Sequence, residues 1–205
     1  MIDDTRLIVL ALCCLVAMIA LGGYVAHRPL APFDVELNAM CGRGTPLAIV
    51  FTRAGYWPAL TCFSIVLLAA DFLVRGGVTF AIVLCGTQLL SQWASERLKD
   101  IFRRVRPDDW IYHQELGFSF PSGHATTAVV FFGGLLFFAS SLPLPHEAQV
   151  AACTVLAIFV AGIPWSRIVL SAHYGTDVLG GMLFGGAWLS LMFVVLRHAT
   201  AQPGY

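Results

Sequence analysis

Three short polar segments in the second half of the chain combine cations, hydroxyl groups and histidines at close spacing. They are Lys99 to Pro107, Pro121 to His124 and Ser166 to Asp177. A phosphate monoester carries about −1.5 to −2 charges near neutral pH, so a partly dehydrated site for it needs several cations and hydrogen-bond donors. These residue types are therefore typical of a site that binds a phosphate ester and reacts with it.

Five residues in these segments are suited to holding the phosphate group. Two arginines can each engage a pair of phosphate oxygens, while a lysine acts as a point charge. A serine adds a hydroxyl donor, and a glycine at a helix start lets backbone N–H groups approach an anion. We predict a phosphate-binding site formed by Lys99, Arg106, Ser122, Gly123 and Arg167.

Two histidines and a carboxylate supply the groups for phosphoryl transfer. His173 and Asp177 are four residues apart, so on a helix they share a face and the carboxylate can reach one ring nitrogen. That contact fixes the tautomer and leaves the other nitrogen free to attack phosphorus. His124 directly follows Ser122 and Gly123 and could protonate the leaving alkoxide. We predict these two histidines and Asp177 as the catalytic residues.

Each of these residues has a simpler interpretation when it is taken alone. A histidine near a helix end is usually solvated or caps the helix. Lys99 and Arg106 could anchor a helix at the membrane interface, and Asp177 could be a charge at a helix start. The residues nevertheless occur together, in order and with complementary roles. The combination favours a catalytic site over several independent structural uses.

The composition places the chain in a lipid bilayer. Hydrophobic residues make up 58% of the sequence and charged residues only 12%, unlike the usual soluble globular domain. A membrane-spanning helix needs about 20 apolar residues. We therefore predict an all-α, six-transmembrane-helix bundle that forms a single domain over residues 1–205. Its spans are the uncharged segments 7–26, 54–70, 76–95, 125–145, 148–166 and 178–196.

The predicted spans collect the polar segments at one membrane face. With six crossings both termini lie on one side, and the longer connections at 28–53, 96–122 and 166–177 lie on the other. The first of these connections includes the apolar stretch Leu47 to Phe51, which indicates a helix along the membrane interface. We expect this connection to shape the substrate site. The predicted active site therefore lies at the membrane face opposite the termini.

The three polar segments resemble the signature of the type-2 phosphatidic acid phosphatase superfamily, which includes membrane lipid phosphate phosphatases and soluble vanadium haloperoxidases. The resemblance spans roughly the C-terminal half of the chain, with no departure at any matched position. It implies His173 as a nucleophile that forms a phosphohistidine, Asp177 as its partner and His124 as general acid. It also implies a six-helix core and a phosphate site made of Lys99, Arg106, Ser122, Gly123 and Arg167.

The activity that we expect is hydrolysis of a phosphate monoester or diphosphate on a membrane lipid, such as phosphatidic acid or phosphatidylglycerophosphate, without a metal or another cofactor. A polyprenyl (undecaprenyl) diphosphate phosphatase is the main alternative, because it would use the same residues. A vanadate-dependent peroxidase needs a bound cofactor and is typically soluble, and three clustered cations would repel a divalent metal. An anion transporter is the non-enzymatic alternative, but no charge falls within a predicted span.

The expected partners are the lipid phosphate substrate and the bilayer. Twelve basic and twelve acidic residues give no indication of a nucleic-acid partner, and no obligate protein partner is evident. Nine of the twelve basic residues lie on the side of the predicted site, so the positive-inside rule would place the site in the cytoplasm. The resemblance to bacterial family members instead implies a multi-pass protein of the bacterial inner membrane with its active site on the outer, periplasmic face. We favour this second orientation.

Overall fold

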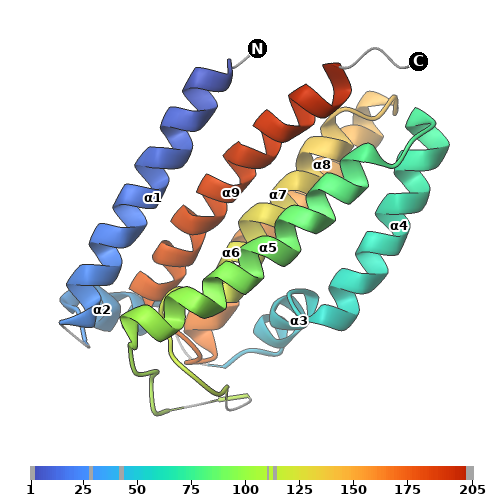
Figure 1. Cartoon of the computed structure of the whole chain (residues 1–205). Helices are drawn as coiled ribbons and strands as arrows, with labels where there is room; N and C mark the ends of the chain where they lie inside the picture. The colour runs from blue at the N-terminus through green and yellow to red at the C-terminus, as the bar shows by residue number, and fades with distance from the viewer. Residues whose placement is uncertain (1–2, 28–29, 42–43, 110, 113–114, 202–205) are drawn as a thin grey trace.

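The computed structural model (Figure 1) is predominantly helical over the residues that it describes, which are 3–27, 30–41, 44–109, 111–112 and 115–201. The two termini lie at one end of a bundle of long helices. In chain order the elements are α1 (Asp4–Ala26), α2 (Pro32–Cys41), α3 (Pro46–Ala54), α4 (Trp57–Arg75), α5 (Thr79–Phe102), α6 (Gly123–Thr127), the π-helix η1 (Ala128–Phe132), α7 (Gly133–Ser140), α8 (His146–Val169) and α9 (Gly175–Ala201).

Among the described residues, five helical segments are long and apolar enough to cross a membrane: α1, α4, the continuous segment Gly123–Ser140, α8 and α9. The predicted span at 76–95 corresponds to α5, which has 24 residues and runs alongside these helices (Figure 1). Polar residues such as Gln88 and Ser91 lower its hydropathy, and they are buried inside the bundle. The predicted all-α membrane bundle is therefore confirmed. Five of the six predicted spans correspond to helices that are long and apolar enough to cross a membrane.

Each of the six helical segments extends beyond its predicted span at one or both ends, α4 and α9 among them. α4 continues past residue 70 to Arg75 because the charge of Asp71 is satisfied inside the protein. Its carboxylate accepts a hydrogen bond from Ala81 N (3.0 Å) and lies 3.9 Å from Arg75 Nε. Asp71 therefore caps the start of the next helix instead of ending its own. α9 begins at Gly175, which places Asp177 in its first turn.

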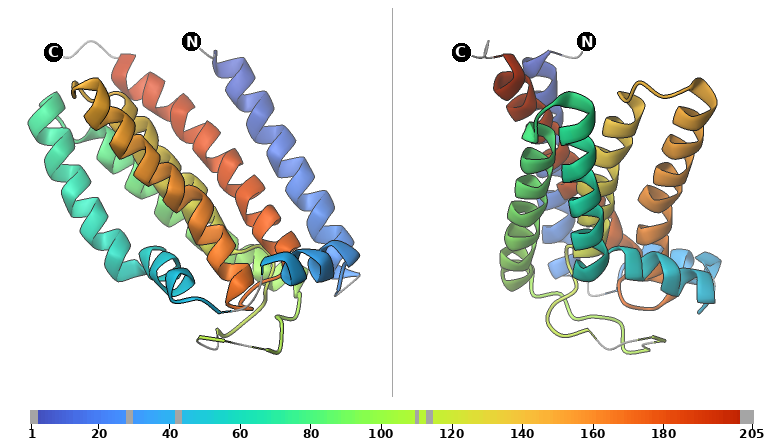
Figure 2. Two further views of the ribbon diagram at one scale, coloured as in Figure 1. Left: turned by 180° about the vertical axis from the view of Figure 1, so that it is seen from behind. Right: turned by 90° about the vertical axis from the view of Figure 1, so that its right-hand side faces the viewer.

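In the described part of the connection at 28–53, the short helices α2 and α3 lie across the end of the bundle opposite the termini (Figure 2). α3 contains the predicted interfacial stretch. It starts at Pro46, and Thr45 Oγ1 caps it by accepting a hydrogen bond from Ala48 N (3.2 Å). α3 packs against α8, and α2 packs against α8 and α9. Both helices therefore help to cover the end where the polar segments lie.

α9 is the central helix, since it packs along α1 and also against α5 and the α6–η1 segment. Side chains from η1 and its neighbours, including Leu84, Phe131, Phe132 and Met192, fill the core between these helices. Many large apolar side chains instead point outward, and Leu73 on α4 is 79% exposed. An apolar outer surface suits a protein whose surroundings are lipid rather than water.

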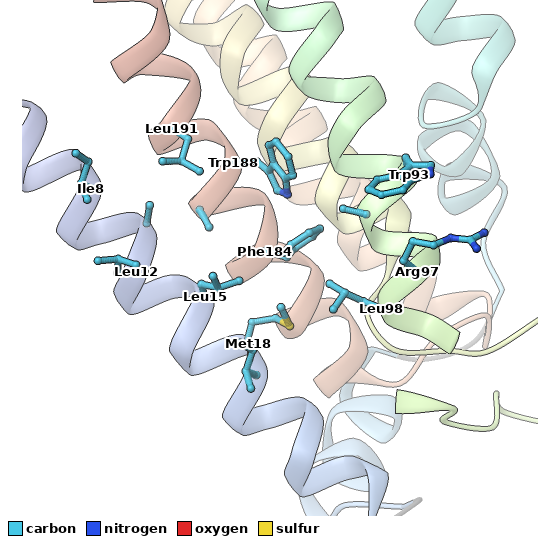
Figure 3. Close-up of a pocket in the computed structure, with 14 residues that line it drawn as sticks. Ile8, Leu12, Leu15, Met18, Trp93, Arg97, Leu98, Phe184, Trp188 and Leu191 are labelled. Carbon is cyan, nitrogen blue, oxygen red and sulfur yellow. The ribbon is translucent and has the colours of Figure 1, made fainter. Parts of the chain in front are cut away.

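An apolar groove of about 430 Å³ opens between α1 and α5 over one side of α9 (Figure 3). Leu12 and Leu15 of α1, Trp93 of α5 and Trp188 of α9 line it. Gln92, the neighbour of Trp93 in the chain, lines a different and more polar cavity. α5 therefore separates this groove from the cavity described next.

Candidate active site

The three predicted polar segments converge at the end of the bundle that lies away from the termini (Figure 1). The last turns of α5, the loop 103–122, the start of α6 and the turn between α8 and α9 meet there. A cavity of about 240 Å³ lies among them, and its lining includes Lys99, Glu115, Gly123, His124 and His173. The structure therefore brings residues from all three segments to one cavity.

His173 and Asp177 lie side by side, with a serine between them. The distance from His173 Nδ1 to Asp177 Oδ2 is 3.6 Å. Ser119 Oγ lies 3.4 Å from the same ring nitrogen and donates a hydrogen bond to Asp177 Oδ2. The other ring nitrogen, Nε2, is 3.2 Å from Arg106 Nη1. This arrangement suits a tautomer with its proton on Nδ1 and its lone pair on Nε2.

The turn that carries His173 is anchored to the end of α8. The carbonyl oxygen of Arg167 accepts hydrogen bonds from Ala172 N (3.0 Å) and His173 N (3.1 Å). Ser171 adopts a left-handed backbone conformation with φ 53°, which reverses the chain before α9. His173 therefore precedes α9 rather than standing on its face, while Asp177 lies in the first helical turn.

The surroundings of His173 favour its neutral form. The side chain is only 1% exposed. Burial, together with the nearby guanidinium groups of Arg106 and Arg167, holds the pKa of His173 well below its ordinary value. A neutral imidazole retains the lone pair that a nucleophile needs.

The two predicted phosphate-binding arginines meet on one carboxylate. Arg167, which is 1% exposed, donates a hydrogen bond to Glu115 Oε1 and another to Thr52 Oγ1. Arg106 Nη1 lies 3.3 Å from Glu115 Oε2 and donates to the carbonyl oxygen of Ala172 (3.0 Å). Glu115 thus places a negatively charged group where two guanidinium groups can reach it together.

Glu115 is ionised in this setting. Burial raises the pKa of Glu115, but the positive charges of Arg167 and Arg106, which both contact its carboxylate, outweigh that effect. The net result is a pKa well below its usual range. An anionic group therefore already occupies the two arginines, and a phosphate would compete with this carboxylate for them.

Lys99 completes the set of cations around the cavity. It lies in the last turns of α5, and its Nζ donates a hydrogen bond to Glu96 Oε1 over 2.6 Å. The side chain is 11% exposed, and both residues line the cavity. Lys99 therefore presents its charge to the same space as the two site histidines.

His124 lines the same cavity, and one of its ring nitrogens forms no hydrogen bond to the described residues. Its ring packs edge-on against Tyr56, with the ring centroids 4.7 Å apart. His124 Nε2 is buried and has no hydrogen-bond partner among the described residues. A buried polar atom that lines a cavity without a partner is suited to a group on the ligand. His124 is thus placed to exchange a proton with a bound substrate.

Ser122 and Gly123 have mainly structural contacts. Ser122 Oγ caps α6 by accepting a hydrogen bond from Ala125 N (3.4 Å), and Ser122 N donates to the carbonyl oxygen of Asp177 (3.0 Å). Gly123 lines the cavity, and its carbonyl oxygen accepts a hydrogen bond from Gln92 Nε2 (2.8 Å). Ser122 therefore holds the start of α6 against α9, while the predicted donation of its hydroxyl to phosphate stays a prediction.

Several residues of the site carry no signal in the local sequence pattern. They include Ser119 between the catalytic pair, Glu115 on the two arginines and Tyr56 against His124. Tyr56 OH also donates a hydrogen bond to Glu115 Oε1 (3.1 Å). Within the described part of the chain, His, Cys, Asp and Glu side chains form no group of three or more that could hold a metal ion.

The motif residues fall inside a recognised family pattern. A family model described as the PAP2 superfamily matches residues 78–201. The chain belongs to the PAP2 superfamily. This confirms the family that the three polar segments indicated, and the matched range contains all of the predicted site residues, from Lys99 to Asp177.

Individual PAP2 relatives resemble part of the chain. It is 34% identical over 99 residues to the phosphatidylglycerophosphatase B of Bacillus subtilis (strain 168), and this aligned region covers 48% of this chain and 47% of that protein. It is 32% identical over 120 residues to a lipid A 1-phosphatase of Rhizobium etli, and this aligned region covers 54% of this chain and 47% of the relative. The chain thus spans about half the length of these relatives.

The fold likeness is more extensive. The crystal structure of a transmembrane PAP2 type phosphatidylglycerolphosphate phosphatase from Bacillus subtilis matches with a TM-score of 0.79, over 95% of this chain and 98% of that chain, at 20% sequence identity. At this identity the match shows a shared fold. The shared fold includes most of α1 to α4, which precede the range of the family model. The protein is a multi-pass membrane protein with bacterial relatives.

Proposed function

We propose that this PAP2 protein is a lipid phosphate phosphatase that hydrolyses a phosphate monoester or diphosphate on a membrane lipid through a phosphohistidine intermediate. One observation carries the proposal. The buried ring of His173 has Nδ1 beside Ser119 and Asp177, and it faces a cavity that also contains Lys99 and the unpartnered Nε2 of His124. A nucleophile, a proton donor and a cation share one space at the end of a membrane bundle.

In the first step Nε2 of His173 attacks phosphorus, and the bond between phosphorus and the lipid oxygen breaks. His124, in its protonated form, gives a proton to the departing oxygen, which leaves as the lipid alcohol. Asp177 and Ser119 hold the proton on Nδ1 and stabilise the positive charge that develops on the ring. The phosphoryl group remains on His173.

In the second step a water molecule attacks the phosphohistidine. His124, now neutral, takes a proton from the water, the bond between phosphorus and nitrogen breaks, and inorganic phosphate leaves. Arg106, Arg167 and Lys99 offset the charge on the transferring group. For the arginines to do so, the phosphate must replace the Glu115 carboxylate on their guanidinium groups.

The substrate is a lipid that presents its phosphate at the active-site end. The names of the relatives point to phosphatidylglycerophosphate and lipid A, and phosphatidic acid offers the same phosphomonoester chemistry. Undecaprenyl diphosphate stays an alternative because its terminal phosphate could use the same residues. No metal or other cofactor takes part in the proposed steps.

We further propose that α5 is the sixth crossing and that residues 1–205 act as a single domain. Its length and its course beside the other helices support a crossing, and its buried polar residues explain its lower hydropathy. In the bacterial inner membrane the active-site end would then face the periplasm, opposite the termini. Reporter fusions at residue 143, in the α7–α8 link on the terminus side, and at the C-terminus should both report the cytoplasm. A periplasmic signal from either fusion contradicts this topology.

Phosphate release by the purified protein tests the activity directly. The panel contains phosphatidic acid, phosphatidylglycerophosphate, lipid A and undecaprenyl diphosphate, each with excess EDTA. We expect release from at least one lipid, inhibition by vanadate, whose adduct resembles the transition state, and a phosphoryl label trapped on wild-type protein but not on His173→Ala. Activity that is lost in EDTA and restored by magnesium or zinc contradicts the mechanism. Anion uptake into vesicles without hydrolysis supports a transporter instead.

A further inference from the structure

A cluster of buried charged side chains lies behind the catalytic pair, outside the predicted phosphate-binding residues. Arg104, from the loop after α5, is 2% exposed and sits between two carboxylates. Its Nη1 donates a hydrogen bond to Asp177 Oδ1, and its Nη2 donates to Asp34 Oδ2, each over 2.6 Å. Both aspartates are fully buried. Arg104 therefore links α2, which lies across the bundle end, to the first turn of α9.

A threonine joins the same three side chains. Asp34 Oδ1 accepts hydrogen bonds from Thr176 N (2.8 Å) and Thr176 Oγ1 (2.9 Å). Thr176 Oγ1 in turn accepts a hydrogen bond from Arg104 Nη1 (2.6 Å). The guanidinium group of Arg104 also lies over the ring of Tyr174, 4.3 Å from its centroid. These contacts fix α2, the loop and the start of α9 relative to one another.

The two oxygens of Asp177 consequently have different tasks. Oδ1 receives Arg104, while Oδ2 receives the hydroxyl of Ser119 and the backbone N–H of Tyr174 (2.8 Å). Oδ2 is also the oxygen that faces His173 Nδ1. Because each oxygen has its own donors, the carboxylate cannot rotate without losing a hydrogen bond. Arg104 therefore sets which oxygen faces His173.

Stability alone gives a poor reason for this cluster, because taking three charges out of water costs much of what their attraction returns. We infer that Arg104 and Asp34 are positioning residues for the pair of His173 and Asp177. They keep Asp177 ionised and directed at His173, and they couple that geometry to α2. The inference rests on the proposed function, since it assigns the cluster a task in that reaction.

Kinetics of three variants on a soluble aryl phosphate test this role. Arg104→Met, which removes the charge, should lower kcat about 100-fold with KM changed by less than about threefold, because Arg104 orients a catalytic group and touches no substrate. Arg104→Lys should recover part of the loss, since it keeps the charge but not the fork. Asp34→Asn should lower kcat about tenfold. Arg103→Met, at the exposed neighbouring arginine, is the matched control and should match wild type.

The pH profile of kcat separates positioning from a general loss of stability. The charged and titratable groups near Asp177 are Arg104, Arg106, His173, Tyr174 and, across Thr176, Asp34. Without the charge of Arg104 the neutral form of Asp177 is favoured. A neutral Asp177 no longer stabilises the positive charge that develops on the ring of His173 during the reaction. The low-pH limb of kcat should therefore move to higher pH in Arg104→Met and stay in place in Arg103→Met.

Thermal unfolding and gel filtration establish that each variant is folded. If Arg104→Met does not fold, Arg104→Lys and Asp34→Asn, which keep size and polarity, decide the question through the same kcat and pH measurements. Folded variants with the kcat and pH limb of wild type overturn the inference, as does a rise in KM at unchanged kcat. Wild-type protein that hydrolyses neither lipid nor aryl phosphate overturns the proposed function instead, and the inference falls with it.

Discussion

The two ends of the helical bundle both pair arginines with carboxylates, but they bury the arginines to different extents. At the active-site end Arg104 and Arg167 are 2% and 1% exposed, and Glu115 receives hydrogen bonds from two different arginines. At the terminus end the side chains of Arg75 and Arg197 are 35% and 37% exposed, and each is paired with an aspartate. The same residue types therefore stand in two different electrostatic settings.

Burial determines what these charges can contribute. An exposed ion pair is screened by water and stabilises a protein by about 0–1 kcal/mol. Buried charges that share partners interact strongly, and such groups are typical of sites that bind a charged ligand or react with it. We therefore assign chemistry to one end and anchoring of helix ends to the other. Equivalent changes at the two ends test this assignment.

The largest expected effect comes from the histidines. His173→Ala removes the attacking atom, so phosphate release from lipid and aryl substrates should fall by at least about 10⁴-fold. His198 at the terminus end is 72% exposed, and its Nε2 lies 3.0 Å from Asp4 Oδ2. His198→Ala is therefore the matched control and should keep wild-type turnover. Comparable losses in both variants would contradict the difference between the ends.

The leaving group distinguishes the second histidine from the first. His124→Ala should lose about 10²- to 10⁴-fold on a lipid phosphate, whose alkoxide needs a proton to depart. The loss should be smaller on a nitrophenyl phosphate, because a nitrophenolate leaves without one. The measurement is the ratio of aryl to lipid turnover relative to wild type. A ratio in His124→Ala equal to that of wild type would contradict the role of His124 as general acid.

Charge-conserving changes at the arginines should have a smaller effect. Arg167→Lys keeps the charge but loses the planar fork that can hold two phosphate oxygens, so kcat/KM should fall about 10- to 100-fold. Arg75→Lys should stay within about twofold of wild type, because Arg75 lies in the last turn of α4, at the end of the bundle away from the cavity (Figure 1). Phosphate release at several substrate concentrations gives both values. An equal loss at Arg75 would mean that the two ends are coupled.

The smallest effect concerns stability rather than activity. Asp71→Ala removes the carboxylate that accepts the hydrogen bond from Ala81 N at the start of α5. Loss of such a cap costs about 1 kcal/mol, which corresponds to roughly 2–4 °C in Tm for a chain of this size. A thermal unfolding curve measures the shift, and turnover well below Tm should match wild type. Lost turnover without a lower Tm would show that this end also serves the reaction.

Local spacing was sufficient to predict which of several candidate residues lie close together. The four-residue separation of His173 and Asp177 predicted their proximity, although His173 lies in the turn before α9 and only Asp177 is on the helix. A serine, a glycine and a histidine at a helix start are a short-range pattern that the helix start itself turns into proximity. The structure accordingly brings His173, His124, Lys99 and Gly123 to one cavity. The runs of apolar residues likewise predicted the helical bundle, because spanning a bilayer requires long uncharged segments.

Contacts between distant parts of the chain could not be predicted in this way. Asp34 and Thr176 are 142 residues apart, and Tyr56 and Glu115 are 59 residues apart. Helical periodicity does not state which loop residue will reach which helix. Arg104 lies within the polar segment Lys99 to Pro107, and nothing in the local sequence marks it as the residue that is buried between two aspartates. The continuation of α4 through Asp71 was missed for the same reason, because its hydrogen-bond donor lies on the next helix.

The cavity beside His173 and His124 encloses about 240 Å³, less than the roughly 300 to 1,000 Å³ of sites that enclose a drug-sized ligand. It has room for a phosphate group and a few water molecules, so under the proposed function the acyl chains of the lipid would stay in the bilayer. The effective substrate concentration would then be the mole fraction of that lipid in the membrane. We therefore expect that diluting reconstituted vesicles with buffer leaves the turnover of each protein molecule unchanged, whereas diluting the substrate with inert lipid lowers it.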